Sequence, residues 1–256
     1  MTGPEHVTPD PVRWVTAFLD TEADSSSATE QFWSAVTGYA VSQRRGAQDE
    51  FATLVPPRGA PYLKVQVVGE APPGRVHLDL HTDDVDGLST VARSLGAEVR
   101  PTIVGYAVCM SPGGLTFCIV GHHPSGEAPP PTGWPGGRSM VDQVCLDIPP
   151  GRWEAECAFW PGLTGWELFD VGEEHPEFRR LRAPADLALQ FLLQRLDDEQ
   201  PIVTAHLDLS ADDRDTEVER HLGLGGADPQ RYDWWTSLRD PAGRRYCVTR
   251  RRPRPT

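Results

Sequence analysis

The sequence lacks the features of several classes of protein. No stretch approaches the ~20 consecutive apolar residues that a membrane-spanning helix needs. It contains no phosphate-binding loop, nucleophile elbow, dinucleotide fingerprint or zinc-spaced Cys/His cluster. Basic residues are also few, since 24 Lys and Arg against 37 Asp and Glu give a formal net charge of −13. Such a charge repels nucleic acid and anionic membrane surfaces, so we expect neither as a partner.

Cysteine is scarce and is not arranged for cross-linking. The five cysteines are an odd number, form no Cys-x-x-Cys pair and lie in apolar patterns, at positions 109, 118, 145, 157 and 247. This usage is typical of buried thiols in a reducing compartment. The first residues, Met1 to His6, lack the basic and apolar regions of a signal peptide, so we expect a cytoplasmic protein. Lys64 is the single lysine, a bias associated with GC-rich bacterial genomes.

One short stretch of the sequence occurs twice. Residues 76–80 read Val-His-Leu-Asp-Leu and residues 205–209 read Ala-His-Leu-Asp-Leu, which places His77 and His206 129 positions apart. Other pairs recur at offsets of 127 to 129, namely Leu19-Asp20 with Leu146-Asp147, Phe32-Trp33 with Phe159-Trp160, Phe51 with Phe178, Gln66 with Gln194, and Cys118 with Cys247. A nearly constant offset is typical of a tandem repeat. The sequence therefore predicts two modules, each long enough to bury its own core.

The composition suggests where the modules begin and end. We expect the first module at residues 12–122 and the second at residues 138–250. Residues 123–137 are rich in proline and glycine without apolar periodicity, which is typical of a flexible linker. The polar start and the basic tail at 250–255 are expected to be solvated termini.

Apolar periodicity predicts strands and helices in alternation. In the first module, strands are expected at 14–20, 51–55, 62–68, 77–80, 104–110 and 115–120, and helices at 28–36 and 83–95. Ser25 to Ser27 are expected to cap the first helix, and Asp83-Asp84 and Asp212-Asp213 to stand at helix N-termini. Pro161 is expected to end the corresponding helix of the second module at Trp160. The expected fold is α+β, with two tandem βαβββ-type modules and curved mixed sheets.

The repeated motifs also carry a family resemblance. They are Phe-Trp-x-x-[Val/Leu]-Thr-Gly-[Tyr/Trp], His-Leu-Asp-Leu and Pro-x-Gly-x-x-[Phe/Tyr]-Cys, in the same order in both modules. This arrangement resembles the vicinal oxygen chelate (VOC) superfamily, which includes glyoxalase I, extradiol dioxygenases, fosfomycin-resistance enzymes and bleomycin-resistance proteins. Within it, the sequence is most similar to the glyoxalase-like branch from actinobacteria. A fold does not define a function, because this superfamily spans metal-dependent chemistry and plain ligand binding.

The resemblance implies where a metal would bind. In metal-using members the ligands come from the first strand, the His-bearing strand and the last strand of a cup-shaped sheet, usually as His or Gln, His, and Glu. The matching positions are Thr16, His77 and Cys118 in the first module, and Gln143, His206 and Cys247 in the second. Cysteine replaces the carboxylate in both, which removes the oxygen donor that Mn²⁺, Fe²⁺ or Mg²⁺ prefers. We therefore expect no metal cofactor, and a divalent metal, if one binds, at Gln143, His206 and Cys247.

The repeated His-Leu-Asp pattern leaves the role of His77 and His206 open. A His and an Asp on one face of a strand could satisfy neighbouring groups by hydrogen bonds within the sheet. Alternatively, either His could act as a general base, because a neutral imidazole titrates near working pH.

Aromatic and amide side chains could line the cups. Tyr106 and Trp235 occupy equivalent strand positions, and rings on a concave sheet suit a flat organic ligand, although core packing is the alternative. Gln66 and Gln194 lie within apolar strands and could hydrogen-bond a ligand or bridge the sheet.

Two functions follow as hypotheses. The first is metal-free binding of a small hydrophobic or aromatic molecule, for resistance or sequestration, by residues Thr16, Gln66, Tyr106, Cys118, Gln143, Gln194, Trp235 and Cys247. The second is an enzyme of the glyoxalase, lyase or dioxygenase type, with a degenerate metal site or with His77 or His206 as general base. The expected partner is a small organic ligand, and the expected assembly is a monomer or a homodimer.

Overall fold

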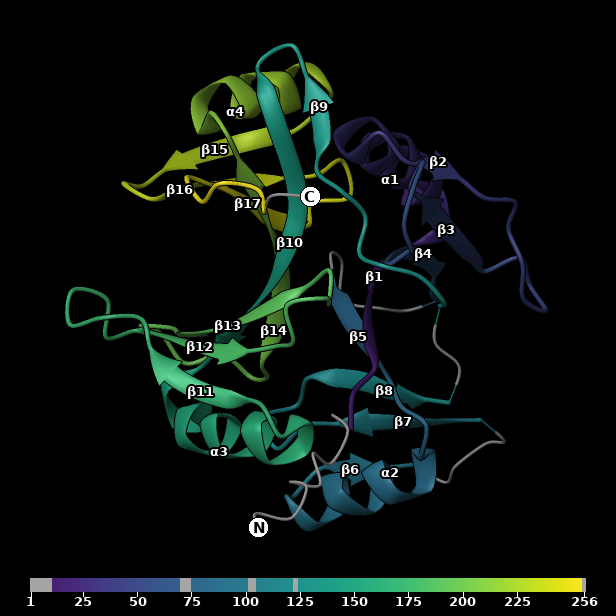
Figure 1. Cartoon of the computed structure of the whole chain (residues 1–256), viewed down its shortest axis with the longest axis vertical. Helices are drawn as coiled ribbons and strands as arrows, with labels where there is room; N and C mark the ends of the chain where they lie inside the picture. Colours follow the sequence, from purple (N-terminus) through teal and green to yellow (C-terminus); the bar gives the residue numbers. More distant parts are fainter. Residues whose placement is uncertain (1–10, 70–74, 101–104, 122–123, 255–256) are drawn as a thin grey trace, which may run out of the picture.

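Each half of the chain forms one large mixed β-sheet (Figure 1). The computed structural model describes residues 11–69, 75–100, 105–121 and 124–254. The strand order of the first sheet is β2-β3-β4-β1-β5-β8-β7-β6, and that of the second is β11-β12-β13-β10-β14-β17-β16-β15, with β9 added to β10. The two orders correspond strand for strand, so the predicted tandem α+β modules are confirmed.

The elements of the first half are β1 (Trp14–Thr21), α1 (Ala23–Thr37), β2 (Ala40–Val41), β3 (Phe51–Val55), β4 (Leu63–Val67), β5 (Val76–His81), α2 (Val85–Ser94), β6 (Glu98–Val99), β7 (Tyr106–Met110) and β8 (Thr116–Val120). Those that follow are β9 (Thr132–Trp134), β10 (Gly137–Ile148), the short 3₁₀ helix η1 (Pro150–Arg152), α3 (Trp153–Thr164), β11 (Glu167–Asp170), β12 (Phe178–Arg182), β13 (Gln190–Arg195), β14 (Thr204–Ala211), α4 (Arg214–Gly223), β15 (Ala227–Arg231), β16 (Trp235–Arg239) and β17 (Arg245–Thr249).

Each sheet is built from two βαβββ units. In the first half, β1, α1 and β2 to β4 form one unit, and β5, α2 and β6 to β8 form the other. Their first strands pair antiparallel at the centre of the sheet, as β10 and β14 do in the second half. The order of the predicted strands and helices, βαββ twice within each half, already indicates this pair of units, and the structure adds the short strands β2 and β6.

Alternation along the central strands separates an apolar face from a polar one. On β10, Val144, Leu146 and Ile148 are completely buried in the core, whereas Gln143 and Cys145 lie on the concave face. On β14, Leu207 and Leu209 likewise face the core. The concave face of each sheet therefore collects the polar side chains of the central strands.

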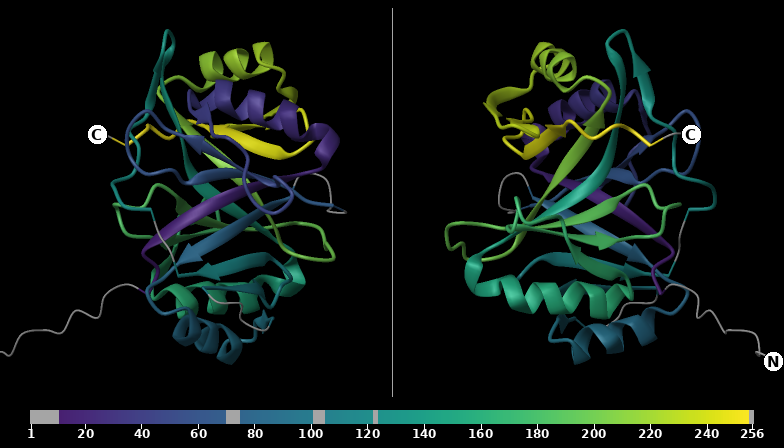
Figure 2. Two further views of the ribbon diagram at one scale, coloured as in Figure 1. Left: turned by 90° about the vertical axis from the view of Figure 1, so that its right-hand side faces the viewer. Right: turned by 60° about the vertical axis from the view of Figure 1, so that its left-hand side comes forward.

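The two halves interlock through their helices. Helix α1 lies beside α4 at one end of the molecule, and α2 lies beside α3 at the other (Figures 1 and 2). The Phe32-Trp33 pair of α1 packs on Tyr246 of the second sheet, with ring centroids 5.8 and 5.3 Å apart. The equivalent Phe159-Trp160 pair of α3 packs on Phe117 of the first sheet, at 5.9 and 5.5 Å. Each repeated Phe-Trp motif therefore completes the core of the opposite half.

Polar contacts reinforce this exchange. Asp240, in the turn between β16 and β17, accepts a hydrogen bond from the indole of Trp33 at 2.9 Å and pairs with the buried guanidinium of Arg244. Arg244 also donates to the backbone oxygen of Asp20 in the first half, at 2.5 Å. The second half thus holds a buried charge that bonds across the interface.

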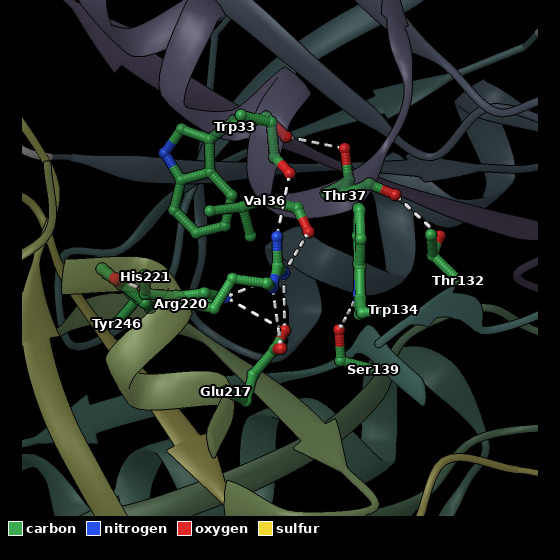
Figure 3. A network of polar contacts seen from close by, with 11 residues as sticks. Trp33, Val36, Thr37, Thr132, Trp134, Ser139, Glu217, Arg220, His221 and Tyr246 are labelled. Carbon is green, nitrogen blue, oxygen red and sulfur yellow. Dashed lines mark hydrogen bonds and ion pairs between the residues drawn. The ribbon is translucent and has the colours of Figure 1, made fainter. Parts of the chain in front are cut away.

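A second network closes the end of helix α1 (Figure 3). Arg220 on α4 donates to the backbone oxygens of Ala35 and Val36, at 3.1 and 2.8 Å, and its guanidinium lies 3.8 Å from the ring centroid of Trp134. These carbonyls belong to the last turn of the helix, where free acceptors and the negative end of the helix dipole favour a cation. Glu217 pairs with the same guanidinium at 2.7 Å.

Several local expectations were wrong. Helix α1 begins at Ala23, so Ser25 to Ser27 lie inside it and its N-cap is Glu22. Helix α3 continues through Pro161 to Thr164, because the proline stands in the last turn, where Trp160 and Leu163 are buried on either side. By contrast, Asp84 and Asp213 cap α2 and α4, as predicted.

The expected linker and tail make specific contacts. Strand β9 lies within residues 123–137, and Thr132 donates to the backbone oxygen of Thr37 at 2.7 Å. In the tail, Arg251 pairs with Asp142, and Arg254 donates to backbone oxygens at residues 185, 187 and 188. The basic tail is therefore held against the second half and is not simply solvated. No helix of the described residues is long and apolar enough to cross a membrane.

Candidate functional site

The concave face of the second sheet contains a cavity of about 300 Å³. Its walls come from the central strands β10, β14 and β17, from β12 and β13, and from the segments before β12 and β16. The lining residues are Gln143, Cys145, Val171, Glu174, His175, Phe178, Arg180, Leu192, Gln194, His206, Asp208, Trp234, Trp235, Cys247, Thr249 and Arg251. A cavity of this size, mainly apolar with a few convergent polar groups, is typical of a small-molecule site.

His206 lies between two carboxylates at the base of this cavity. Its Nδ1 is 2.8 Å from Oδ2 of Asp147 on the neighbouring strand β10. Its Nε2 is 3.3 Å from Oδ1 of Asp208, two residues further along β14. All three side chains are more than nine-tenths buried. Strand pairing produces this geometry, because the β10–β14 register sets Cys145 opposite His206 and Asp147 two residues further along β10.

The two carboxylates favour the charged imidazolium. Burial alone opposes charge on His206, but Asp147, through its charge and its hydrogen bond, outweighs burial and raises the pKa of His206 well above its usual value. Burial likewise opposes ionisation of Asp208, but hydrogen bonding and attraction to His206 lower the pKa of that carboxyl. The group is therefore an imidazolium held between two carboxylates.

Further donor atoms point to the same place. The amide nitrogen of Gln143 donates to Oδ2 of Asp208 at 2.6 Å, and the ligand atoms of His206, Asp208 and Cys247 all lie within 4.8 Å of one another. Oε1 of Gln143 and Oδ1 of Asp208 are buried without a hydrogen-bond partner in the described structure. Burial raises the pKa of the Cys247 thiol, the largest influence on it.

An aromatic partition separates this cavity from a second one. The rings of Phe178 and Trp235 meet edge to face at 5.8 Å, and Tyr232 stacks on Trp235 at 4.8 Å. A larger cavity of about 850 Å³ lies beyond them and shares Phe178, Gln194 and Trp235 with the first. Asp147 lines the larger cavity, whereas His206 lines the smaller one. The His206–Asp147 pair therefore lies between the two cavities.

The first half contains an equivalent His–Asp pair, but a different side chain covers it. Nδ1 of His77 is 2.7 Å from Oδ1 of Asp20, as in the His206–Asp147 pair. Phe18 takes the place of Cys145, and its ring stacks on His77 with centroids 4.5 Å apart and an interplanar angle of 13°. The ammonium of Lys64 lies 5.0 Å from the Phe18 centroid, and Phe51 packs on the edge of the ring at 6.2 Å. Phe18 therefore occupies the space above the histidine in this half.

The predicted site residues divide between the two halves. His206, Gln143, Gln194, Trp235 and Cys247 line one cavity. Those of the first half lie apart from it, on β1, β4, β5, β7 and β8, namely Thr16, Gln66, His77, Tyr106 and Cys118. Of these, Thr16 is fully buried and its hydroxyl lies 2.9 Å from Nε2 of His81, while Tyr106 is exposed at the start of β7.

Sequence reasoning missed several residues of the second cup. Asp147 had a signal, because Leu146-Asp147 repeats Leu19-Asp20, but its contact with His206 joins strands 59 residues apart. Arg180 and Arg251 lie in basic stretches that resemble solvated surface, yet both line the cavity. Asp208 belonged to the repeated motif, but its position beside Nε2 of His206 depends on the fold.

Several known structures share the fold of this chain. The Mn(II)-bound glyoxalase from Novosphingobium aromaticivorans has a TM-score of 0.66 at 17% identity, with 94% of this chain and 82% of that chain covered. The 2,3-dioxygenase LapB from Pseudomonas sp. KL28 has a TM-score of 0.59 at 11% identity, with 94% and 93% covered. An extradiol ring-cleaving dioxygenase from B. fuscum has a TM-score of 0.61 at 14% identity, with 97% and 75% covered. Identities this low support a shared fold alone.

Sequence comparison gives the family. No curated protein matches this sequence. The model of the glyoxalase-like domain matches twice, over residues 16–120 and 143–249, which is once in each half. The two matched segments correspond to the two sheets and together cover most of the chain. The chain therefore belongs to the glyoxalase-like domain family of the VOC superfamily, with the domain present in two tandem copies.

Proposed function

We propose that this protein binds a small, flat organic molecule in the cup of its second half, and that His206 serves as a proton donor to it. The ligand enters the cavity beside Trp234 and Trp235, and its ring packs against the aromatic and apolar walls. First-half residues, including His77, support the fold and take no part in binding.

One observation carries this proposal, namely the difference between two otherwise equivalent cups. Both contain a histidine bonded to an aspartate of the neighbouring strand, at 2.7 and 2.8 Å. Phe18 covers the histidine in the first cup, whereas the smaller Cys145 leaves a cavity in the second. Space above the polar group thus exists where the side chain is small, and that space is the proposed binding site.

The charges in the cup define the chemistry of His206. The hydrogen bond from Nδ1 to Asp147 fixes the ring and leaves the Nε2 proton facing Asp208 and the cavity. Because the pKa of His206 is raised, the group is charged at neutral pH and suits an acid better than the neutral general base expected from sequence. Protonation of a ligand oxygen or carbanion is the step that this arrangement supports.

A second candidate function is metal-assisted chemistry at the same place. Oε1 of Gln143 and Oδ1 of Asp208, neither of which accepts a hydrogen bond from the described residues, would fit a divalent ion of borderline softness together with Nε2 of His206 and the thiol of Cys247. Asp147 would orient the histidine from its other nitrogen. A bound ion would polarise a ligand oxygen. In this case Nε2 would be a ligand atom and His206 could not donate a proton.

Filling the second cup tests the proposed function. Cys145→Phe places in the second cup the residue that fills the first, and calorimetric titration with 2-naphthoate and 2-naphthamide measures binding. We expect the wild type to bind at least one compound and Cys145→Phe to lose that binding, while Phe18→Leu in the first cup retains it. Thermal unfolding checks that each variant is folded. Binding by a folded Cys145→Phe variant, or the absence of binding by wild type, would contradict the proposal.

Elemental analysis separates the two candidates. Protein purified without chelator is measured for Mn, Fe, Co, Ni, Cu and Zn, and compared with the Cys247→Ala and Cys157→Ala variants. Stoichiometric metal that is lost from Cys247→Ala but retained by Cys157→Ala, whose cysteine lies on α3 away from the cup, would replace the proton-donor proposal with the metal-assisted one. Absence of metal from all three proteins supports His206 as the donor.

A further inference from the structure

We propose that the ligand of the second cup is a carboxylate, with Arg180 as the residue that recognises it; this inference rests on the proposed function and specifies its ligand class. Arg180 lies on β12 and lines the same cavity as His206. An aromatic acid would thus be held at two points, with its ring among the apolar walls and its carboxylate at the guanidinium.

The guanidinium of Arg180 has N–H donors for which the described part of the chain supplies no acceptor. Its Nε is buried and lacks a hydrogen-bond partner, and its side chain makes no hydrogen bond or ion pair within the described part of the chain. A guanidinium carries five donors in a planar fork that matches the two oxygens of a carboxylate. Leaving such a group half-buried and unpaired is costly, so an acceptor supplied by a ligand accounts for its place in the wall.

The neighbouring charges set the charge of the ligand. Arg251 also lines the cavity with an unpartnered buried Nε, but its Nη2 already binds Asp142 at 2.7 Å. Burial, and then the nearby positive charge of Arg251, lower the pKa of Arg180. Arg251 is thus paired with Asp142 and His206 lies between Asp147 and Asp208, so Arg180 is the cation of the cavity wall that has no carboxylate of the described residues bound to it, and one such cation matches a monoanion better than a phosphate. Glu174 at the cavity mouth is exposed, so water screens its repulsion.

The fold provides a matched comparison for Arg180. In the first half the equivalent position is Thr53, whose hydroxyl accepts a hydrogen bond from Arg45 at 2.9 Å. Next to Arg180, the guanidinium of Arg179 binds Asp170 at 3.0 Å and lies over Trp153, on the outer side of the sheet. At this position a cation therefore occurs only in the open cup, and Arg179 serves as a control of equal charge.

Three probes with the same rings test the inference. Calorimetric titration compares 2-naphthoate, 2-naphthamide and 2-naphthyl phosphate with wild type, Arg180→Met and Arg179→Met. Methionine retains most of the aliphatic stem and removes the charge. We expect wild type to bind 2-naphthoate about tenfold more tightly than 2-naphthamide, as one charge-assisted pair predicts. Arg180→Met should lose that preference, with a smaller effect on amide binding than on acid binding because the amide oxygen is an uncharged acceptor, and Arg179→Met should keep it.

Each outcome separates the inference from the proposed function. Equal binding of acid and amide by wild type, or an unchanged preference in Arg180→Met, overturns the carboxylate assignment while leaving the cup as a binding site. Tighter binding of the naphthyl phosphate than of the naphthoate also overturns it, in favour of a dianion. Loss of amide and acid binding to the same extent in a folded Arg180→Met variant makes Arg180 a structural residue. Binding of none of the three by wild type removes both proposals.

Discussion

Asp147 and His206 are 59 residues apart in the chain, yet their side chains meet at 2.8 Å across two neighbouring strands. The same relationship holds between Asp20 and His77 in the first half. The side chain that lies above each pair, Phe18 in the first half and Cys145 in the second, decides whether the imidazole faces a cavity. In the second half the imidazole of His206 faces a cavity.

Replacing Asp147 should change the ionisation of His206. We expect Asp147→Asn to lower the pKa of His206, because burial opposes charge and this carboxylate is the main group that outweighs it. A raised folded-state pKa stabilises the protein fully below the unfolded value of about 6.5, and this stabilisation is lost as pH rises through the folded value. The variant should therefore be less stable than wild type near neutral pH, with the difference decreasing at high pH.

Histidine NMR titration measures this change directly. Asp20→Asn, the equivalent change in the first half, is the control and should leave the His206 resonances in place. An unchanged His206 titration in Asp147→Asn would show that Asp147 is not the group that holds the charge.

Acid stability should depend on the network around Arg220. Burial opposes ionisation of Glu217, but hydrogen bonds from Arg220 and His221 lower its pKa to about 2. A depressed carboxylate pKa contributes stability above the unfolded value, and this contribution is lost as pH falls towards the folded value. We expect Arg220→Met to cost up to about 3 kcal/mol at pH 7 through Glu217, with the difference from wild type disappearing in acid.

Urea unfolding at a series of pH values tests this expectation. Arg231→Met removes an exposed arginine that binds Asp215 and Glu219, and should cost less than about 1 kcal/mol. A pH-independent loss in Arg220→Met would assign its effect to the α1 carbonyls and Trp134 instead of Glu217.

The contacts of Asp240 with Arg244 and Trp33 should contribute strongly to the free energy of unfolding. We expect Asp240→Ala to destabilise the protein by about 3 to 5 kcal/mol, because it leaves the buried guanidinium of Arg244 without its carboxylate and Trp33 without its acceptor. Chemical denaturation should give a single transition in wild type, since each Phe-Trp pair completes the core of the other half. Two resolved transitions, or a cost no greater than that of Asp215→Ala at the surface, would contradict this prediction.

The aromatic partition should set the size of the ligand. Phe178→Ala removes one of the two rings between the cavities of about 300 and about 850 Å³. We expect roughly tenfold weaker binding of 2-naphthoate, from lost ring contacts, and improved relative binding of the longer anthracene-2-carboxylate. Phe169→Ala is the control, because Phe169 lines neither cavity. An unchanged ratio between the two acids would mean that Phe178 does not separate the spaces.

Much of the fold was predictable because the sequence contains a tandem repeat. The constant offset identifies equivalent positions, and the family's strand order, applied to those positions, correctly groups Gln143, His206 and Cys247 in one cup. The Phe-Trp motif marks equivalent positions in two helices, but the packing of each pair on the opposite half depends on the arrangement of the modules. Periodicity along one strand carries no information about which sheet a helix covers.

The site was harder to predict for a related reason. The difference between the cups lies in Phe18 and Cys145, both ordinary apolar residues that pattern analysis treats alike. Arg180 follows Arg179 directly, and alternation sends one into the cup and the other outward, but both look like surface residues in a basic stretch. The neighbours that the folded structure places beside each arginine, and not the composition of the stretch, determine which one is left without a carboxylate.

The packing of Phe18 on His77 indicates how a ligand ring would lie in the second cup. A benzene ring covalently attached to the chain already rests 4.5 Å above the imidazole of His77, nearly parallel to it, with a cation on its side and Phe51 against its edge. The second cup repeats the imidazole and, in Phe178, the residue at the edge of the ring; Leu192 stands at the position of Lys64, and the ring itself is missing. The first half can therefore serve as an internal template for docking, in which a foreign ring lies face down on His206 where the protein elsewhere places its own.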